Sequence, residues 1–281
     1  MISIPIAIPN PTFEWMANFW SYMQTKVYNN KAKNNSLLAV VKKNHINDPE
    51  INKIDWDINN LNYTITNSIY DYVASTNRNC VVINVFSALK DITKYYSLDE
   101  TICITDMDVV PLKPYNGLLP KDNEIICYDG YEDWHMFIAN ESKQNYNKIK
   151  KYLTHFDNGY INGGFVPILI KNKTLQLIID EVIYISEKII EDPNETSEWK
   201  WWACMTALSI ACHNNKIVMK GYNNTYIPGY NKFNLDDHYW AHYSVDKIFN
   251  KHQYPNIDIS KFPNNNFYNY IKEWMLTKPH M

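Results

Sequence analysis

The sequence predicts an α/β fold with a mostly parallel central sheet and helices on both faces. Two observations support this. Short apolar runs rich in β-branched residues alternate with stretches in which apolar residues recur at helical spacing. Such alternation is typical of strand–helix–strand units, whose crossover helices cover both faces of a parallel sheet. The chain has 281 residues, 46% of them hydrophobic, which is enough to bury a large core in one domain.

The first elements lie in the amino-terminal quarter of the chain. Residues 2–8 alternate and are rich in β-branched side chains, so they predict a strand that ends at the turn 9–11. Thr12 is expected to cap a helix whose apolar positions recur at helical spacing. Residues 37–41 predict a second strand. The pattern then weakens, and a helix is expected near residues 65–74.

The same two patterns recur through the rest of the chain. Apolar runs predict strands at residues 81–85, 101–105, 125–128, 165–170 and 217–220. Helical spacing predicts helices at residues 87–96, 175–190 and 199–212. The carboxyl-terminal third is irregular and aromatic, and we expect most of its aromatic side chains to lie in a core or an interface.

Composition and charge exclude several classes of protein. The net charge is −3 and the pI about 6.2, with scattered lysines, so the basic surface of a nucleic-acid-binding protein is missing. Apolar runs stay well short of the roughly 18 residues of a membrane span. With 7 glycines, the chain has neither a P-loop nor a dinucleotide-binding glycine motif.

The cysteines and the amino terminus bear on the cellular compartment. Five cysteines show no Cys-x-x-Cys spacing, which favours reduced, packed thiols in a cytoplasmic protein. The start MISIPIAIPNP lacks the basic segment and the cleavage site of a secretory signal. We therefore expect a cytoplasmic protein with no integral membrane segment.

The run ICITDMDVVPL places two aspartates directly after a predicted buried strand. On an extended segment Asp106 and Asp108 point to the same side, and Met107 points to the other. Ligands of open α/β sheets bind beyond the carboxyl ends of the strands. Two carboxylates suit Mg²⁺ or Mn²⁺, which bind through one or two acids plus substrate phosphates. Either the strand simply ends in water, or the pair shares a cation.

A second acidic pair in the chain provides a comparison. Asp55 and Asp57 have the same spacing but lie in the Asn-rich stretch INKIDWDINNLN, with no apolar strand before them. We interpret that pair as a solvated loop. Position at the end of a strand is what distinguishes Asp106 and Asp108.

The run SALKDITKYYSLDETICITDMDVVPLKPY resembles the signature of GT-A-fold glycosyltransferases, especially the glycogenin-like and galactosyltransferase-like group. In that group a basic residue on a helix precedes a strand that ends in Asp-x-Asp. The resemblance implies that Lys90 fills the basic position and that Asp106 and Asp108 bind the metal, with Met107 between them at the donor.

Two later segments extend this resemblance. YINGGFVPI resembles the segment that lines the donor-sugar pocket, which implies a role there for Asn162, Gly163 and Gly164. WAHYSVDKIF resembles the closing His-x-x-Gly-x-x-Lys segment, which implies that His242 is the third metal ligand and that Lys247 contacts the diphosphate. The interval in this chain is one residue short and lacks the glycine. His238 competes with His242 for the role.

The resemblance implies a metal-dependent glycosyltransferase with Mn²⁺ or Mg²⁺ as its cofactor. Its single GT-A domain would span residues 1–281, with a nucleotide-binding part over about 1–130 and a donor-sugar and acceptor part over about 131–281. Ile8, Pro9 and Asn10 would receive the base and ribose of a nucleoside-diphosphate sugar, with a UDP-sugar favoured. The acceptor would be a hydroxyl on a glycan, a lipid-linked sugar or a protein.

The stereochemical course and two alternative functions stay open at this point. An inverting enzyme needs a carboxylate base, for which Glu198 is the candidate with Asp157 behind it, whereas a retaining enzyme of the glycogenin-like kind needs none there. A sugar-nucleotide nucleotidyltransferase would normally carry a basic, Gly-rich loop after the first strand, which residues 8–12 lack. A non-catalytic carbohydrate-binding protein that keeps the fold is the other alternative.

Overall fold

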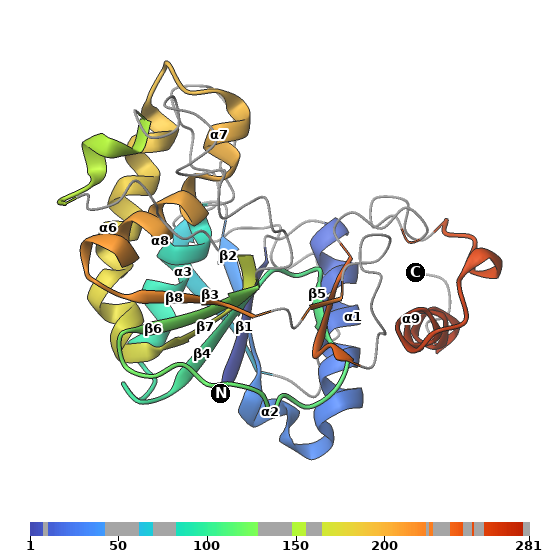
Figure 1. The fold of residues 1–281 in the computed structure, drawn as a ribbon. Helices are drawn as coiled ribbons and strands as arrows, with labels where there is room; N and C mark the ends of the chain where they lie inside the picture. The colour runs from blue at the N-terminus through green and yellow to red at the C-terminus, as the bar shows by residue number, and fades with distance from the viewer. Residues whose placement is uncertain are drawn as a thin grey trace.

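A seven-stranded sheet forms the centre of the protein (Figure 1). The structure is a computed structural model that describes residues 1–7, 11–42, 62–69, 83–128, 148–155, 165–222, 225–226, 237–243, 249 and 256–277. The strands are β1 (Ile2–Ala7), β2 (Leu37–Lys42), β3 (Asn62–Ile69), β4 (Thr101–Thr105), β6 (Glu124–Tyr128), β7 (Phe165–Lys171) and β8 (Val218–Gly221).

The order of the strands is β3-β2-β1-β4-β7-β6-β8. Strands β3, β2, β1 and β4 pair in parallel, as do β6 and β8, and β7 alone runs antiparallel to its neighbours β4 and β6. The sheet is therefore mostly parallel, which confirms the predicted fold class.

Helices cover both faces of this sheet (Figure 1). They are α1 (Pro11–Tyr28), α2 (Ala32–Asn35), α3 (Ile83–Thr93), α6 (Asn172–Glu191), α7 (Ser197–Trp201), α8 (Ala203–Asn214) and α9 (Asn266–Thr277). Helices α1 and α9 lie on one side of the sheet, and α3, α6 and α8 lie on the other. No helix in the described part of the chain is both long and apolar enough to span a bilayer.

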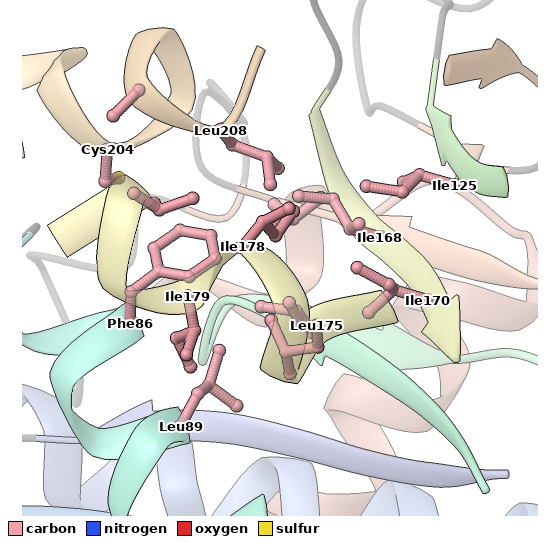
Figure 2. Close-up of a cluster of buried hydrophobic side chains, with 14 of the residues drawn as sticks. Phe86, Leu89, Ile125, Ile168, Ile170, Leu175, Ile178, Ile179, Cys204 and Leu208 are labelled. Atoms are coloured by element: carbon pink, nitrogen blue, oxygen red, sulfur yellow. The ribbon is translucent and has the colours of Figure 1, made fainter. Parts of the chain in front are cut away.

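Each face of the sheet contributes to its own hydrophobic cluster. Along β2, Leu37 and Val41 belong to the first cluster, while Leu38 and Val40 belong to the second, as expected for side chains that alternate across a strand. Figure 2 shows the first cluster, in which strands β6 and β7 pack against three helices. Its labelled side chains are Phe86, Leu89, Ile125, Ile168, Ile170, Leu175, Ile178, Ile179, Cys204 and Leu208.

The second cluster is aromatic and joins α1 to the end of the chain. Phe19 of α1 packs against Trp274 of α9, with ring centroids 5.2 Å apart. Tyr243 packs against Phe19 of α1 and Phe267 of α9, and Phe249 packs against Phe19 and Tyr243. These aromatic residues of the last third therefore build a core, as predicted.

A three-stranded sheet lies beside the main one. It consists of β5 (Val109–Pro111), β10 (Trp240–His242) and β9 (Thr225–Tyr226), in the order β5-β10-β9. Strand β10 is antiparallel to β5 and parallel to β9. The N–H of Leu112 donates to the carbonyl of Tyr239 at 2.8 Å and extends the first pairing. The small sheet thus brings the carboxyl-terminal third of the chain to the segment that follows the acidic pair.

Two predicted elements are wrong in type. The helix expected near residues 65–74 is contradicted over residues 65–69 by strand β3, which pairs in parallel with β2 so that Ile65 lies opposite Val40. Residues 70–74 lie outside the described residues. The run of aromatic and β-branched residues at 63–66 suits a strand. The strand expected at residues 81–85 is contradicted from Ile83 onward, where α3 begins. The buried apolar face of α3 consists of Phe86, Ala88, Leu89 and Ile92, and a short apolar run at its start cannot distinguish a helix from a strand.

Three predicted boundaries also shift. Helix α1 begins at Pro11, so Thr12 lies inside the helix instead of capping it, and proline suits the first helical position. Helix α3 ends at Thr93 instead of continuing to residue 96. The single helix expected at residues 199–212 is divided, because the N–H of Trp202 bonds the carbonyl of Trp199 at 3.2 Å and interrupts the regular pattern between α7 and α8.

The other predicted strands and the helix at residues 175–190 are confirmed by β1, β2, β4, β6, β7, β8 and α6. The prediction of packed, unpaired thiols is confirmed for the described cysteines. Cys103, Cys127, Cys204 and Cys212 are buried free thiols, and Cys80 lies outside the described residues.

Candidate metal site

The acidic pair sits in a tight turn between two buried strands. Strand β4 is buried along its whole length and ends at Thr105, immediately before Asp106. The N–H of Val109, the first residue of β5, donates to the carbonyl of Asp106 at 3.1 Å and closes the turn. Asp106 is exposed, whereas Asp108 is buried. The turn therefore offers one carboxylate to solvent and holds the other inside the protein.

Met107 lies on the opposite side of this turn. Its side chain is 2% exposed and belongs to the second hydrophobic cluster. The alternation expected along the segment is therefore observed, with the two acids away from the core that receives Met107. Only the backbone of Met107 is left to face a ligand at the acidic pair.

His242 reaches the acidic pair through strand pairing. In the antiparallel register of β10 and β5, His242 lies opposite Val109, the residue after Asp108. Its Nε2 atom is 3.3 Å from Oδ1 of Asp108. The N–H of Tyr243 donates to the carbonyl of Asp108 at 3.1 Å, which fixes the strand one residue further along. Backbone hydrogen bonds between segments distant in sequence thus place the imidazole of His242 beside Asp108.

The three side chains form one potential ligand set. One ligand atom from each of Asp106, Asp108 and His242 lies within 4.8 Å of the others. Ligands bound at about 2.1–2.4 Å on opposite sides of one ion would be roughly 4–5 Å apart, so the set fits a single ion with small side-chain adjustments. Two carboxylates and one imidazole suit Mn²⁺ or a similar first-row ion. His238, the competing histidine, is not in this group.

The residues around the set provide a low-dielectric environment. Burial raises the pKa of Tyr243 well above its ordinary value, and the negative charge of Asp108 adds to the shift. Burial likewise raises the pKa of Cys204 to about 12, with a further contribution from Asp106. Cys204 is at the start of α8, so this helix begins within electrostatic range of the acidic pair. A cation is attracted more strongly by carboxylates in such surroundings than in water.

Lys90 is placed differently from the acidic pair. Lys90 lies in the last turn of α3. Strand β4 follows α3 in the chain and ends immediately before Asp106. The Nζ atom of Lys90 pairs with Oδ1 of Asp180 on α6 at 2.6 Å, and both side chains are exposed. A contact between Lys90 and a donor stays a prediction, and this ion pair does not support it.

Of the other predicted site residues, the described part of the chain includes one. Glu198 is in α7, the short helix before α8. The remaining ones lie outside the described residues, namely Ile8, Pro9, Asn10, Asp157, Asn162, Gly163, Gly164 and Lys247. Asp55 and Asp57, the comparison pair, also lie outside them.

Sequence reasoning did not single out Tyr243, although its backbone anchors Asp108. A tyrosine in an aromatic segment carries no local signal of this role, because the anchoring bond comes from strand pairing. The alternation of Trp240, Ala241 and His242 is too short to predict a strand on its own.

Comparison with known proteins adds a family. Residues 51–221, more than half of the chain, match the sequence profile of the hydroxyproline O-arabinosyltransferase family N-terminal domain. The matched segment contains Asp106 and Asp108 and ends before His242. No curated protein is detectably similar in sequence. Among solved structures, that of mouse xyloside xylosyltransferase 1 in its apo form is similar with a TM-score of 0.40 and 8% identity, over 87% of this chain and 97% of that one.

Proposed function

The chain belongs to the hydroxyproline O-arabinosyltransferase family, and from this premise we propose that it is a metal-dependent glycosyltransferase that uses a nucleoside-diphosphate sugar. One observation carries the proposal. Two carboxylates and an imidazole, from segments far apart in the chain, meet within 4.8 Å at the carboxyl end of β4. Ligands of open α/β sheets bind at that edge.

The family name narrows the acceptor and the donor. Of the three predicted acceptor classes, a glycan, a lipid-linked sugar and a protein, the name favours a protein hydroxyl such as that of hydroxyproline. It also makes a nucleoside-diphosphate arabinose the first donor to test, with UDP as the favoured nucleotide. We include the GT-A fold, and its division near residue 130 into a nucleotide part and a donor-sugar and acceptor part, in this proposal.

The chemistry of glycosyl transfer matches the ligand set. As the bond to the anomeric carbon breaks, the sugar gains positive character and the leaving diphosphate gains negative charge. Asp106, Asp108 and His242 would hold a divalent ion, which supplies stabilisation for that negative charge. Asp108 and His242 would fix the position, since only 6% and 12% of their side chains are exposed. Exposed Asp106 leaves its side of the set open to the donor.

Further residues complete the proposed donor site. Ile8, Pro9 and Asn10 would bind the base and ribose, and Lys247 would contact the diphosphate. Asn162, Gly163 and Gly164 would hold the sugar hydroxyls, because missing side chains permit close backbone approach. If the enzyme inverts configuration, Glu198 would deprotonate the acceptor hydroxyl, with Asp157 as the second candidate.

A donor panel tests the proposal directly. The protein is incubated with UDP-, GDP- and ADP-sugars and Mn²⁺, with and without EDTA, and release of free nucleoside diphosphate is followed. Release that EDTA abolishes is the expected result. Production of pyrophosphate from a sugar phosphate and a nucleoside triphosphate would indicate a nucleotidyltransferase instead. Donor binding without any release, with acceptors present, would indicate a non-catalytic carbohydrate-binding protein.

The two acidic pairs provide a matched test of the site. Asp108→Ala should lower turnover about 100-fold or more, because stabilisation of the leaving group by a bound ion contributes several kcal/mol. Asp57→Ala should leave turnover unchanged. Circular dichroism and the melting temperature establish that both variants fold. Equal activity of the two variants would show that Asp106 and Asp108 are not the functional pair.

A further inference from the structure

Lys200, in the short helix α7, is a buried lysine. Its side chain is 5% exposed, although lysine is almost never fully buried unless it is paired. No hydrogen-bond acceptor in the described part of the chain reaches its Nζ atom. Nearby Lys148 and Lys151 differ, because they form ion pairs with Glu195 and Asp192 at 2.5 and 2.8 Å.

Such an arrangement is unfavourable for the folded state. An ammonium group that is buried without an acceptor loses its hydration and gains nothing in exchange. An apolar side chain of similar length would fill the same space without this loss. Because no acceptor among the described residues pairs with Lys200, its charge points to a role in binding an anion.

The position of Lys200 identifies the anion. Figure 1 places α7 beyond the end of the sheet at which β1 finishes and α1 begins, which is the edge that carries the acidic pair. Cys204, one turn further along the chain, is buried at the start of α8. The charge of Asp106 contributes to the raised pKa of Cys204. Lys200 therefore lies four residues before a side chain that is within electrostatic range of Asp106.

We propose that Lys200 binds the diphosphate of the nucleotide-sugar donor beside the ion held by Asp106, Asp108 and His242. The inference rests on the proposed function and adds a donor-binding residue to it. The diphosphate is the anionic group that a metal ion at this edge would engage. A lysine ammonium acts as a compact point charge toward phosphate oxygens, and its burial strengthens that attraction by excluding water.

Lys200→Met tests this inference, because methionine keeps the length of the side chain and removes its charge. Titration calorimetry measures Mn²⁺ alone, and then UDP, GDP and ADP in the presence of Mn²⁺. For the nucleoside diphosphate that binds the unmodified protein best, we expect affinity to fall about 10- to 100-fold, as for loss of a charge-assisted hydrogen bond. Mn²⁺ affinity should change less than about twofold, and the melting temperature should stay the same or rise.

Three further variants provide a control, a charge-conserving comparison and a replacement for Lys200→Met. Lys188→Met removes an exposed lysine that pairs with Glu191 and has no role in the proposed site, so it should leave both affinities unchanged. Lys200→Arg keeps the charge and should retain most of the nucleotide affinity. If Lys200→Met is too unstable to measure, Lys200→Gln replaces it, with the same loss of nucleotide affinity expected.

The possible failures are distinguishable. If the unmodified protein binds Mn²⁺ and a nucleoside diphosphate, and neither neutral variant weakens the nucleotide, the role of Lys200 is overturned while the proposed function stands. If the unmodified protein binds Mn²⁺ but no nucleoside diphosphate, the proposed function fails and this inference fails with it. Loss of Mn²⁺ affinity in Lys200→Met would assign Lys200 to the architecture of the metal site instead.

Discussion

His242 is positioned by its neighbours in the backbone. Strand β10 pairs with β5 so that His242 lies opposite Val109, and the N–H of Tyr243 bonds the carbonyl of Asp108. These contacts set the imidazole 3.3 Å from the Asp108 carboxylate. A histidine held in this way loses little further conformational freedom when it binds an ion. Its place in the protein therefore suits a ligand as well as a packed side chain.

Substitution of the two histidines separates these roles. His242→Ala should lower Mn²⁺ affinity at least about tenfold, because it removes a direct ligand, and His238→Ala should leave that affinity unchanged. His238 is 2% exposed, so its replacement should instead lower the melting temperature. Calorimetric titration of metal-free protein measures the first effect, and thermal unfolding measures the second. The reverse pattern would make His238 the ligand.

The sequence singled out the three side chains of the candidate metal site but not the residues that surround them. Asp106 and Asp108 follow a strongly apolar strand, and His242 followed from its order in a resemblance that covers most of the chain. Lys200 stands among tryptophans in SEWKWWACM, with nothing local to distinguish a buried lysine from an exposed one. Burial of a single side chain depends on how α7 packs, which local spacing does not encode.

At the scale of elements, Asn172 joins two helices. It is the first residue of α6, its side chain is fully buried, and its backbone N–H donates to the carbonyl of Glu100 at 2.8 Å. Its Nδ2 atom donates to carbonyls at the end of α3 and just beyond, at 2.9 Å to Thr93, 3.0 Å to Tyr96 and 3.2 Å to Ser97. The last carbonyls of a helix lack partners within it. The Asn172 side chain donates hydrogen bonds to the carbonyls at this end and thereby holds α3 against the start of α6.

Asn172→Ala should therefore destabilise the protein. We expect the free energy of unfolding to fall by about 2–4 kcal/mol, since a fully buried amide that donates to three carbonyls is removed. Urea denaturation followed by circular dichroism measures the change. Asn194→Ala is the matched control, because exposed Asn194 bonds only Asp192 nearby, and we expect a change within about 0.5 kcal/mol. Similar losses in both variants would contradict a special role for Asn172.

Elements with long or clean patterns were predictable, and elements decided by tertiary contacts were not. Helix α6 has sustained helical periodicity, and β4 is a buried apolar run bounded by polar residues. Strand β3 was predicted as a helix because its pairing with β2, which the sequence does not display, determines its conformation. The start of α3 was predicted as a strand because a buried helix face and a buried strand look alike over five residues.

At the scale of the whole molecule, burial of thiols links stability to alkaline pH. Burial raises the pKa of Cys103 and of Cys204 from 9.0 to about 12. Between these values the unfolded chain releases a proton that the folded chain keeps. The contribution of the two protonated thiols to the free energy of unfolding is therefore complete below pH 9. It decreases as the pH rises toward 12, by roughly 1.4 kcal/mol per pH unit for each thiol.

A double variant isolates this effect from the tyrosines, which also titrate at alkaline pH. We expect Cys103→Ala/Cys204→Ala to be less stable than the unmodified protein at pH 8, because small cavities form in the core. Between pH 8 and pH 10 the difference should shift by about 3 kcal/mol in favour of the variant. Urea denaturation at both pH values measures it. A difference that stays constant would show that the two thiols ionise readily in the folded protein.

The wide separation of Asp108 and His242 along the chain has a consequence for biosynthesis. A nascent polypeptide that has left the ribosome only as far as β8 already contains the acidic pair but has no β10 to complete the ligand set. If the proposed function holds, the ligand set is complete only after translation has passed His242 and β10 has paired with β5. The proposed enzyme would therefore acquire its metal late in synthesis, and a chain terminated before His242 would lack a ligand.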